Sequence, residues 1–490
     1  MSKPSYASML GFVLMACAWS VDGHAASQDA SATKLQAIPT YENCSLYLNG
    51  SQAAPGGLGV RYRTAAGGAW QDGHPLVVSA TDPVPRGSLF GLMAGTAYEA
   101  EILRPDGTRL AATTFSTWAE QVPIARSISL DAHESAGGPL LIEQGGTPEG
   151  WIRYIAPPGF VIDGGERDTE AVLLRNAAYV ILDGLTVRGG VRHGIRLSQC
   201  HDVRISGCDI SGFGRVGVQD VAKDGKYYDA KGAAINYDAG ICIEDCGRLT
   251  IERNWIHDPR SHANSWFFSH PAGPTAMFTR ATGEVVVRWN DFVGSDRHRW
   301  NDVMEGWGNS KREGAFNRDS DIHGNYLAFA NDDAIELDGG QCNVRFYGNL
   351  IQGTMCGVST APNLRGPSWV IANVIANLAD ERGLGSAGIK NGGGSTHSAG
   401  TTFFYHNTFA GQGSGISAVG FGNDRDRGLF RAVGRNNLFA ITGCGIQDPY
   451  MPEGTSYDGD VFAMPWSAPG LRVTARPCGP ASVEAPAALA

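Results

Sequence analysis

Hydrophobic and polar residues alternate along most of the chain in short runs, which are separated by clusters of Asn, Asp and Gly. Three such runs follow one another at Asp321–Tyr326, Ala334–Leu337 and Asn343–Gly348. Alternation over a few residues, bounded by turn-forming residues, is the sequence sign of short strands. We therefore predict many short strands joined by tight turns.

The short runs recur in a regular register. An Asn that precedes a short, mostly apolar pair marks one position, at Asn254, Asn290, Asn325, Asn349, Asn373, Asn407 and Asn437. A Gly or Ala followed by Ile or Val marks a second position, at Gly194, Gly240, Ala334, Gly357, Gly388 and Gly415. The closest Asn marks lie 24 residues apart (349 − 325 and 373 − 349). A unit of this size with several short strands buries its apolar face only by stacking on its neighbours, which predicts a solenoid.

The two marks resemble those of the right-handed parallel β-helix proteins of the pectate-lyase-like class. The entry segment Ile162–Gly165 adds to the resemblance, which covers roughly Pro139 to Asp448. It implies an all-β fold with a right-handed parallel β-helix, which we place at residues 121–450, and an internal ladder of the marked Asn side chains. The class includes lyases, hydrolases, epimerases, adhesins and phage tailspikes. The resemblance therefore specifies the fold more than the reaction.

Residues 35–120 are predicted to form a small β-sandwich ahead of the solenoid. Alternating runs occur at Ser45–Leu48, Val60–Arg63 and Tyr98–Leu103. The segment Leu92–Tyr98 resembles the tyrosine corner of fibronectin type III-like domains, in which the Tyr hydroxyl caps a crossing loop. We expect this domain to pack against the helix, and we assign residues 451–490 to a C-terminal tail.

The first residues indicate export. Lys3 precedes the apolar run Met9–Val21 and a small-residue site that ends at Ala25, so residues 1–25 are predicted to be a signal peptide. A rival interpretation is that Cys17 is lipidated, although the residues before it match the lipoprotein motif poorly. No other stretch is apolar and long enough for a membrane span. We expect a secreted or periplasmic protein.

Charge and cysteine content narrow the partners. The formal net charge is −10 and no basic stripe is present, which argues against a nucleic-acid partner. Nine cysteines would remain after cleavage, and no CxxC pair favours zinc. Cys200 and Cys246 fall at equivalent places, where either a disulfide bridge or a stack of buried thiols fits.

Two carboxylate-bearing segments repeat at one interval. Asp302 and Glu305 lie 31 residues before Asp333 and Glu336 (333 − 302 and 336 − 305), and Asp332 adjoins the second segment. If Met304 and Ile335 point inward, alternation turns the two Glu side chains outward on adjacent coils. A later coil carries Lys390 at the corresponding outward position. Stacked carboxylates about 4.8 Å apart repel one another, and the repulsion raises at least one pKa.

Three functions are consistent with this cluster. The first is glycoside hydrolysis of a polysaccharide without a cofactor, with Asp333 as general acid and Asp302 or Glu336 as base or nucleophile. The pair Asp332-Asp333 resembles the double aspartate of polygalacturonase-like hydrolases, although neither a neighbouring Gly-His nor a downstream Arg-Ile-Lys accompanies it.

The second function is a Ca²⁺-assisted polysaccharide lyase or epimerase. Its base would be Lys390, Lys311 or Arg312. The third is a non-catalytic glycan-binding surface protein.

Four long insertions are expected to wall a cleft beside the carboxylates: Phe213–Asp238, His257–Gly283, Gly294–Asn317 and Asp380–Gly400. Their polar and aromatic residues suit sugars. The substrate-binding candidates are His298, Trp300, Trp307, Lys311, Arg312, Lys390 and His397.

Overall fold

The computed structural model describes residues 33–50, 57–79, 81–130, 139–166, 169–419, 425–463 and 483–484. The predicted signal peptide, Cys17 and most of the predicted C-terminal tail lie outside these residues. Within the described part of the chain, the structure contains no helix with the length and apolar character that a bilayer crossing requires.

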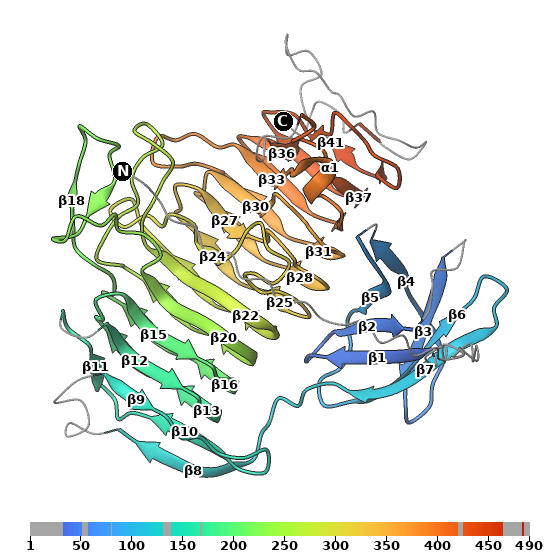
Figure 1. The fold of residues 1–490 in the computed structure, drawn as a ribbon, viewed down its shortest axis with the longest axis horizontal. Coiled ribbons are helices and arrows are strands. Elements are labelled where there is room, and N and C mark those ends of the chain that lie inside the picture. Colours follow the sequence, from blue (N-terminus) through green and yellow to red (C-terminus); the bar gives the residue numbers. More distant parts are fainter. Residues whose placement is uncertain are drawn as a thin grey trace, which may run out of the picture. The chain divides into compact units, whose positions relative to one another are not determined.

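Seven antiparallel strands form a β-sandwich at the N-terminal end of the described chain (Figure 1). They are β1 (Lys34–Pro39), β2 (Cys44–Asn49), β3 (Leu58–Thr64), β4 (Gln71–Ser79), β5 (Asp82–Leu89), β6 (Ala97–Leu103) and β7 (Arg109–Ser116). Strand β4 pairs with β3 as far as Leu76 and with β5 from Val77, so it passes from one sheet to the other. The Tyr98 hydroxyl accepts a hydrogen bond from the Met93 backbone N–H at 2.8 Å, which is the contact that the tyrosine-corner pattern predicts. The fibronectin type III-like assignment of the domain stays a prediction.

The rest of the described chain coils into three parallel sheets, as the repeat predicts. The sheet that carries the carboxylates is called here the site sheet (Figure 1). Its strands are β9 (Leu140–Ile142), β12 (Glu170–Arg175), β15 (His193–Ser198), the first halves of β20 (Ala239–Glu252) and β22 (Thr275–Arg288), β24 (Met304–Gly306), β27 (Asp333–Glu336), β30 (Cys356–Thr360), β33 (Ala387–Asn391), β36 (Ser414–Ala418) and β39 (Ile446–Gln447).

A second parallel sheet begins where the long strands β20 and β22 bend out of the site sheet. It contains β8 (Ile124–Ser129), β10 (Trp151–Ile155), β13 (Ala178–Asp183), β16 (His201–Ser206), the second halves of β20 and β22, β25 (Asp321–His323), β28 (Val344–Tyr347), β31 (Ser368–Ile371), β34 (Thr401–Tyr405), β37 (Arg431–Arg435) and β40 (Ser456–Asp458).

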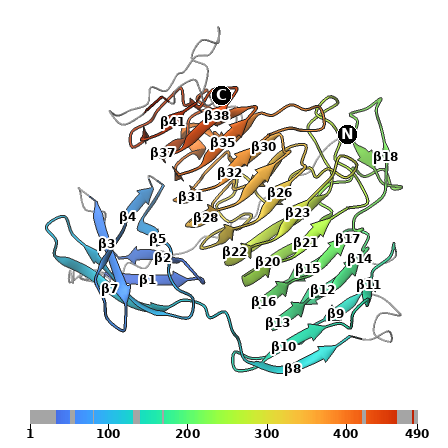
Figure 2. The same cartoon turned by 180° about the vertical axis from the view of Figure 1, so that it is seen from behind.

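The third sheet is seen in the reverse view (Figure 2). Its strands are β11 (Val161–Asp163), β14 (Thr186–Arg188), β17 (Asp209–Ser211), β21 (Trp255–His257), β23 (Asp291–Val293), β26 (Tyr326–Ala328), β29 (Leu350–Gln352), β32 (Val374–Ala376), β35 (Thr408–Gly411), β38 (Leu438–Ile441), β41 (Val461–Phe462) and β42 (Val483–Glu484). The described loops add a two-stranded hairpin, β18 (Val218–Gln219) and β19 (Tyr227–Tyr228), and one short helix, α1 (Gly394–His397).

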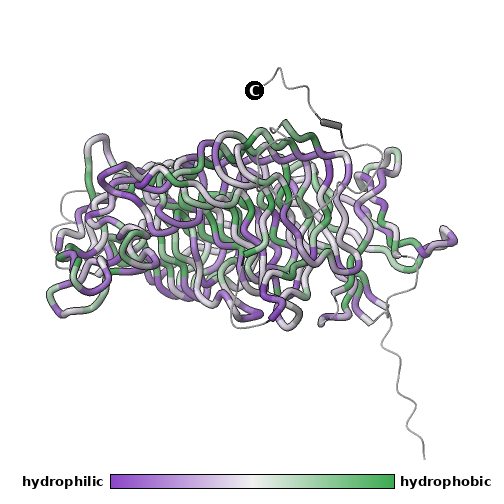
Figure 3. The backbone as a smooth tube through the Cα atoms, turned by 90° about the horizontal axis from the view of Figure 1, so that it is seen from above, coloured by the Kyte–Doolittle hydropathy of each residue, from purple (hydrophilic) through white to green (hydrophobic). Residues whose placement is uncertain are grey.

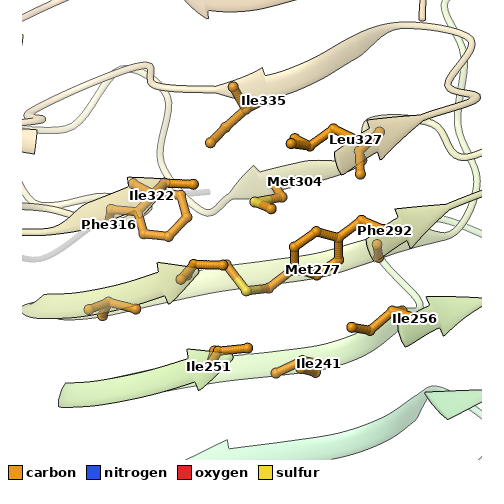
Figure 4. Packing of buried hydrophobic residues seen from close by; sticks show 14 of the residues in the cluster. Ile241, Ile251, Ile256, Met277, Phe292, Met304, Phe316, Ile322, Leu327 and Ile335 are labelled. Atoms are coloured by element: carbon orange, nitrogen blue, oxygen red, sulfur yellow. The ribbon is translucent and has the colours of Figure 1, made fainter. Parts of the chain in front are cut away.

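Side chains from all three sheets fill the interior of the coils. Hydrophobic and hydrophilic residues alternate at short intervals along the chain (Figure 3), so each coil sends one set inward. Met277, Met304 and Ile335 are fully buried and pack with Phe292 and Leu327 (Figure 4). This continuous core fixes the direction of the residues between the inward positions.

The predicted Asn ladder is confirmed. From Asn254 to Asn437, each ladder Asn donates two hydrogen bonds to the side-chain Oδ1 of the next ladder residue. One comes from its backbone N–H and one from its side-chain Nδ2, at 2.8–3.1 Å. The series ends on Asp460, whose Oδ1 takes the last position. The ladder satisfies turn amides that cannot reach water.

The cysteines at equivalent places form no bridge. Cys200 and Cys246 are buried free thiols, and the Cys246 sulfur accepts a hydrogen bond from the Cys200 backbone N–H at 3.1 Å. The stack of buried thiols is therefore the correct alternative for this pair.

Candidate active site

One column of outward-facing side chains runs along the site sheet. Successive coils contribute Arg196, Cys242, Phe278, Glu305, Glu336, Ser359 and Lys390. Met304 pairs with Ile335 in register, and both are buried in the core. The residues that follow them, Glu305 and Glu336, therefore stack on adjacent coils as alternation requires.

Three carboxylates converge beside this column. One carboxylate oxygen from each of Asp302, Asp333 and Glu336 lies within 4.8 Å of the other two. The backbone N–H of Asp333 donates to Asp302 Oδ1 at 2.8 Å, which ties the start of β27 to the preceding coil. Asp333 Oδ1 is buried and has no hydrogen-bond partner among the described residues. The three oxygens thus surround a position that is suited to a water molecule or a cation.

Lys390 neutralises part of this negative charge. Its Nζ forms an ion pair with Asp333 Oδ2. Burial by itself lowers the pKa of Lys390, but the attraction of Asp333 and Asp332 outweighs burial and holds the pKa well above its usual value. Lys390 is therefore a fixed positive charge at neutral pH.

Burial makes the surrounding carboxyl groups reluctant to ionise. It raises the pKa of Glu305 to about 8, and Asp332 and Asp333 add to the rise. It likewise raises the pKa of Asp332 to about 8 and that of Asp338 to about 6. The pKa values of Asp302 and Glu336 are also raised, by burial first and by their acidic neighbours second. The site therefore retains protons at neutral pH, which is what a general acid requires.

Glu305 lies in an open pocket of about 270 Å³. Trp307, Asn309 and Lys311 line the same pocket, and Trp307 is 49% exposed. Asn309 Nδ2 donates to Glu336 Oε2 at 2.9 Å, so this loop also contacts the second Glu of the column.

One expected substrate contact is wrong. Trp300 is fully buried and stacks on Phe213, with ring centroids 6.2 Å apart; its loop folds back onto the core, so it offers no surface to a sugar. The substrate contact expected of Arg312 stays a prediction; its Nη2 lies 3.3 Å from Asp82 Oδ2 in the sandwich, and its side chain is 45% exposed.

The general-acid role expected for Asp333 stays a prediction. Its Oδ2 is held in the ion pair with Lys390, and its buried Oδ1 lies near the oxygens of Asp302 and Glu336.

The remaining expected contacts are distributed around the site. Trp307 and Lys311 line the Glu305 pocket. His298 lies in a tight turn, whose backbone is bonded to Ser295. His397 lies in α1, soon after the strand that carries Lys390, with its Nδ1 2.8 Å from Thr396 Oγ1.

The four insertions brace one another on one side of the coils. Ser269 Oγ in the second insertion donates to the Asp224 carbonyl in the first at 2.7 Å. His262 Nε2 lies 3.3 Å from Glu381 Oε2 in the fourth, and the Arg299 backbone N–H in the third donates to His262 Nδ1 in the second at 3.2 Å. The insertions are therefore held as one wall.

Sequence reasoning missed several residues of the site. Tyr237 and Phe278 line the Glu305 pocket. His270 Nε2 lies 3.4 Å from Asp332 Oδ2. Phe278 had a usable signal, because it follows Met277 in a run whose register matches Met304; Tyr237 and His270 lie in loops, which carry no such register.

A family model described as the right handed beta helix region matches residues 170–366. With the three parallel sheets, this match identifies the fold as a right-handed parallel β-helix. No curated protein matches the chain.

Two solved structures are similar in part. The catalytic domain of a GH87 alpha-1,3-glucanase in complex with tetrasaccharides is 10% identical, with a TM-score of 0.30, over 89% of this chain and 93% of that chain. Pectate lyase Pel3 from Pectobacterium carotovorum is 12% identical, with a TM-score of 0.16, over 85% of this chain and 91% of that chain. At these scores neither structure is evidence for a reaction.

Proposed function

We propose that this protein is an exported carbohydrate-active enzyme, a glycoside hydrolase that cleaves a polysaccharide. The observation that carries the proposal is the placement of Glu305 in an open pocket beside Trp307, next to the three converging carboxylates Asp302, Asp333 and Glu336. Hydrolysis needs one protonated and one ionised carboxyl group around the scissile bond.

In this proposal Glu305 is the general acid. With a pKa near 8 it carries a proton at neutral pH and donates it to the leaving oxygen. Asp333 is the base, because its Oδ1 has no hydrogen-bond partner among the described residues and lies beside the oxygens of Asp302 and Glu336. It takes a proton from a water held among the three converging oxygens, and that water attacks the sugar. Because water lies between the base and the sugar, we expect inversion at the anomeric carbon.

The lysine and arginine geometry favours hydrolysis over elimination. A lyase base must be neutral to abstract a proton. Lys390 is held charged by Asp333 and Asp332, and Arg312 pairs with Asp82 of the sandwich. Of the three expected bases, Lys311 alone lines the pocket.

A Ca²⁺-assisted lyase or epimerase is the second candidate. The observation that favours it is the convergence of Asp302, Asp333 and Glu336, together with the unpartnered Asp333 Oδ1. Hard oxygen ligands of this kind fit Ca²⁺, and these three residues would hold it. When bound, the ion would neutralise the carboxylate of a uronate. The ammonium group of Lys390 already lies on Asp333 and competes with a cation there.

The test of the hydrolase is Glu305→Gln, assayed against polysaccharides that the unsubstituted protein cleaves. We expect kcat to fall by about 10²-fold or more, since the amide cannot donate the proton. The activity of the unsubstituted protein should decline as the pH rises through about 8.

Glu313→Gln is the matched control, because Glu313 is an exposed acidic residue in the loop that follows β24. Undiminished turnover by Glu305→Gln would remove the hydrolase mechanism. Binding of glycans without turnover by the unsubstituted protein would instead favour a non-catalytic glycan-binding protein.

A further inference from the structure

The Glu305 pocket continues into a longer groove along the coils. A second pocket of about 400 Å³ shares Tyr237, Phe278 and Trp307 with the first. It reaches past β22, β20 and β15 to Thr169, just before β12. Five neighbouring strands, from β24 to β12, span about 19 Å at about 4.8 Å per strand. This length accommodates several sugar units on one side of the carboxylates.

The guanidinium groups that line the groove are all charge-compensated. Arg196 donates to Glu170 at 2.8 Å and to Glu244 at 2.6 Å. Arg192 forms an ion pair with the buried Asp238, and Arg280 pairs with Asp245 at 2.8 Å. The three arginines thus face four carboxylates, of which Asp238 is shared with Arg215. A polyanion gains little attraction from these three arginines, because each of them already has a carboxylate partner.

The end of the groove at Glu305 is also unfavourable to an acidic sugar. The cluster there contains Asp302, Asp332, Asp333 and Glu336, and its one buried lysine is already paired with Asp333. A uronate carboxylate at this point therefore gains no free cation from Lys390.

Aromatic rings supply the attraction for an uncharged sugar chain. Trp307 is 49% exposed and Tyr237 is 38% exposed. Tyr237 stacks on Phe278, with ring centroids 4.9 Å apart, so its ring is held in place. The apolar faces of sugars pack on such rings. Next to them, each arginine–carboxylate pair presents donors beside acceptors, which matches the neighbouring hydroxyl groups of a sugar.

We propose that the groove binds a neutral glycan, with its sugars over Trp307 and Tyr237 and its hydroxyl groups bonded to the arginine–carboxylate pairs. This inference builds on the proposed hydrolase, because the same groove ends at Glu305. It names the substrate class as uncharged polysaccharide and excludes uronate polymers.

The test measures binding to Glu305→Gln, so that the ligand is not consumed. Affinity electrophoresis in gels with dextran, laminarin, xyloglucan or galactomannan is compared with gels that contain polygalacturonate or alginate. We expect retardation by at least one neutral polymer, the same at low and high salt, since uncharged ligands are not screened. Adding Trp307→Ala should weaken this binding about tenfold. Trp255→Ala is the control, because Trp255 is 48% exposed on the third sheet.

A charge variant tests directly whether the carboxylates compensate the arginines of the groove. Glu244→Gln leaves Arg196 with one carboxylate fewer, and we expect it to gain salt-sensitive binding to polygalacturonate. Asp209→Asn is the matched control on the third sheet; Asp209 and Glu244 both pair with an arginine and both have side chains that are 32% exposed.

Several results would overturn the inference: salt-sensitive binding of acidic polymers by the Glu305→Gln protein, no binding of any neutral polymer, or equal losses in the Trp307 and Trp255 variants. The proposed hydrolase fails separately. If the groove binds a neutral polymer that the unsubstituted protein does not cleave, the hydrolase is wrong and the inference stands. If the protein hydrolyses only an acidic polymer, the inference is wrong and the hydrolase stands.

Discussion

At the scale of single residues, the site concentrates buried acids that alternation along the strands places on one face. Glu305 and Glu336 could be predicted from sequence, because the inward residues Met304 and Ile335 fix their direction. Burial raises their pKa values because it destabilises the ionised carboxylate group. The same burial supplies a proton donor at neutral pH.

The residue-scale prediction concerns the pH dependence of stability. Glu305 titrates near 4.5 when unfolded and at about 8 when folded. Between these values the folded state binds the extra proton, so the free energy of unfolding falls as the pH rises. The contribution is fully present below about 4.5 and lost as the pH passes about 8. In thermal melts, the Tm of Glu305→Gln should therefore fall less between pH 5 and pH 8 than the Tm of the unsubstituted protein. Equal or steeper loss in the variant would contradict this.

Residues in the insertions were harder to place. Trp300 and Trp307 lie in one insertion and have the same side chain, yet one is buried against Phe213 and the other is exposed in the pocket. Arg312 is drawn to Asp82, which lies 230 residues away in sequence. Loop direction depends on such distant partners, which local periodicity does not encode.

At the scale of elements, the coil repeat could be predicted because the ladder requires one residue type at one place. Asn349 illustrates the constraint. Its Oδ1 accepts from the backbone and side chain of Asn325, and its Nδ2 donates to Asn373 and to the Ile322 carbonyl. The bend of β20 and β22 through two sheets was not predicted, because the strand pattern continues unbroken across each bend.

Asn349→Ala tests the ladder. The substitution leaves the buried Asn325 N–H without its acceptor, and each unsatisfied buried group costs about 1–3 kcal/mol. We expect Tm to fall by several degrees in differential scanning calorimetry. Asn49→Ala is the control, since the Asn49 side chain bonds only at the exposed surface of the sandwich. Equal Tm values for the two variants would show that the ladder is not a source of stability.

At the scale of the whole molecule, the sandwich and the helix are joined through buried polar contacts. Residues Thr33–Ala490 form one compact unit. Tyr47 in the sandwich donates to Asp319 in the helix at 2.6 Å. Arg345 in the helix is fully buried, pairs with Asp321 and donates to Ser45 at 2.8 Å. The sequence predicts that the two domains pack together, but it does not identify these residues, because the partners lie about 300 positions apart.

Tyr47→Phe tests whether the two parts unfold together. The loss of the hydroxyl leaves the buried Asp319 with one donor fewer, at a cost of about 1–3 kcal/mol. We expect one calorimetric transition that moves as a whole to lower temperature. Tyr62→Phe, within the sandwich, should leave it in place. Two transitions, of which only one moves, would mean that the domains are thermally independent.

The chemistry of the products tests the central claim most directly. The protein would be incubated with a neutral polysaccharide that it binds and, in parallel, with polygalacturonate, each with and without a chelator. The products would be examined for new reducing ends and for the near-ultraviolet absorbance of unsaturated sugars. Paired carboxylates predict new reducing ends, no such absorbance and no effect of the chelator. Unsaturated products from an acidic polymer, abolished by the chelator, would contradict the hydrolase and assign Asp302, Asp333 and Glu336 to a cation.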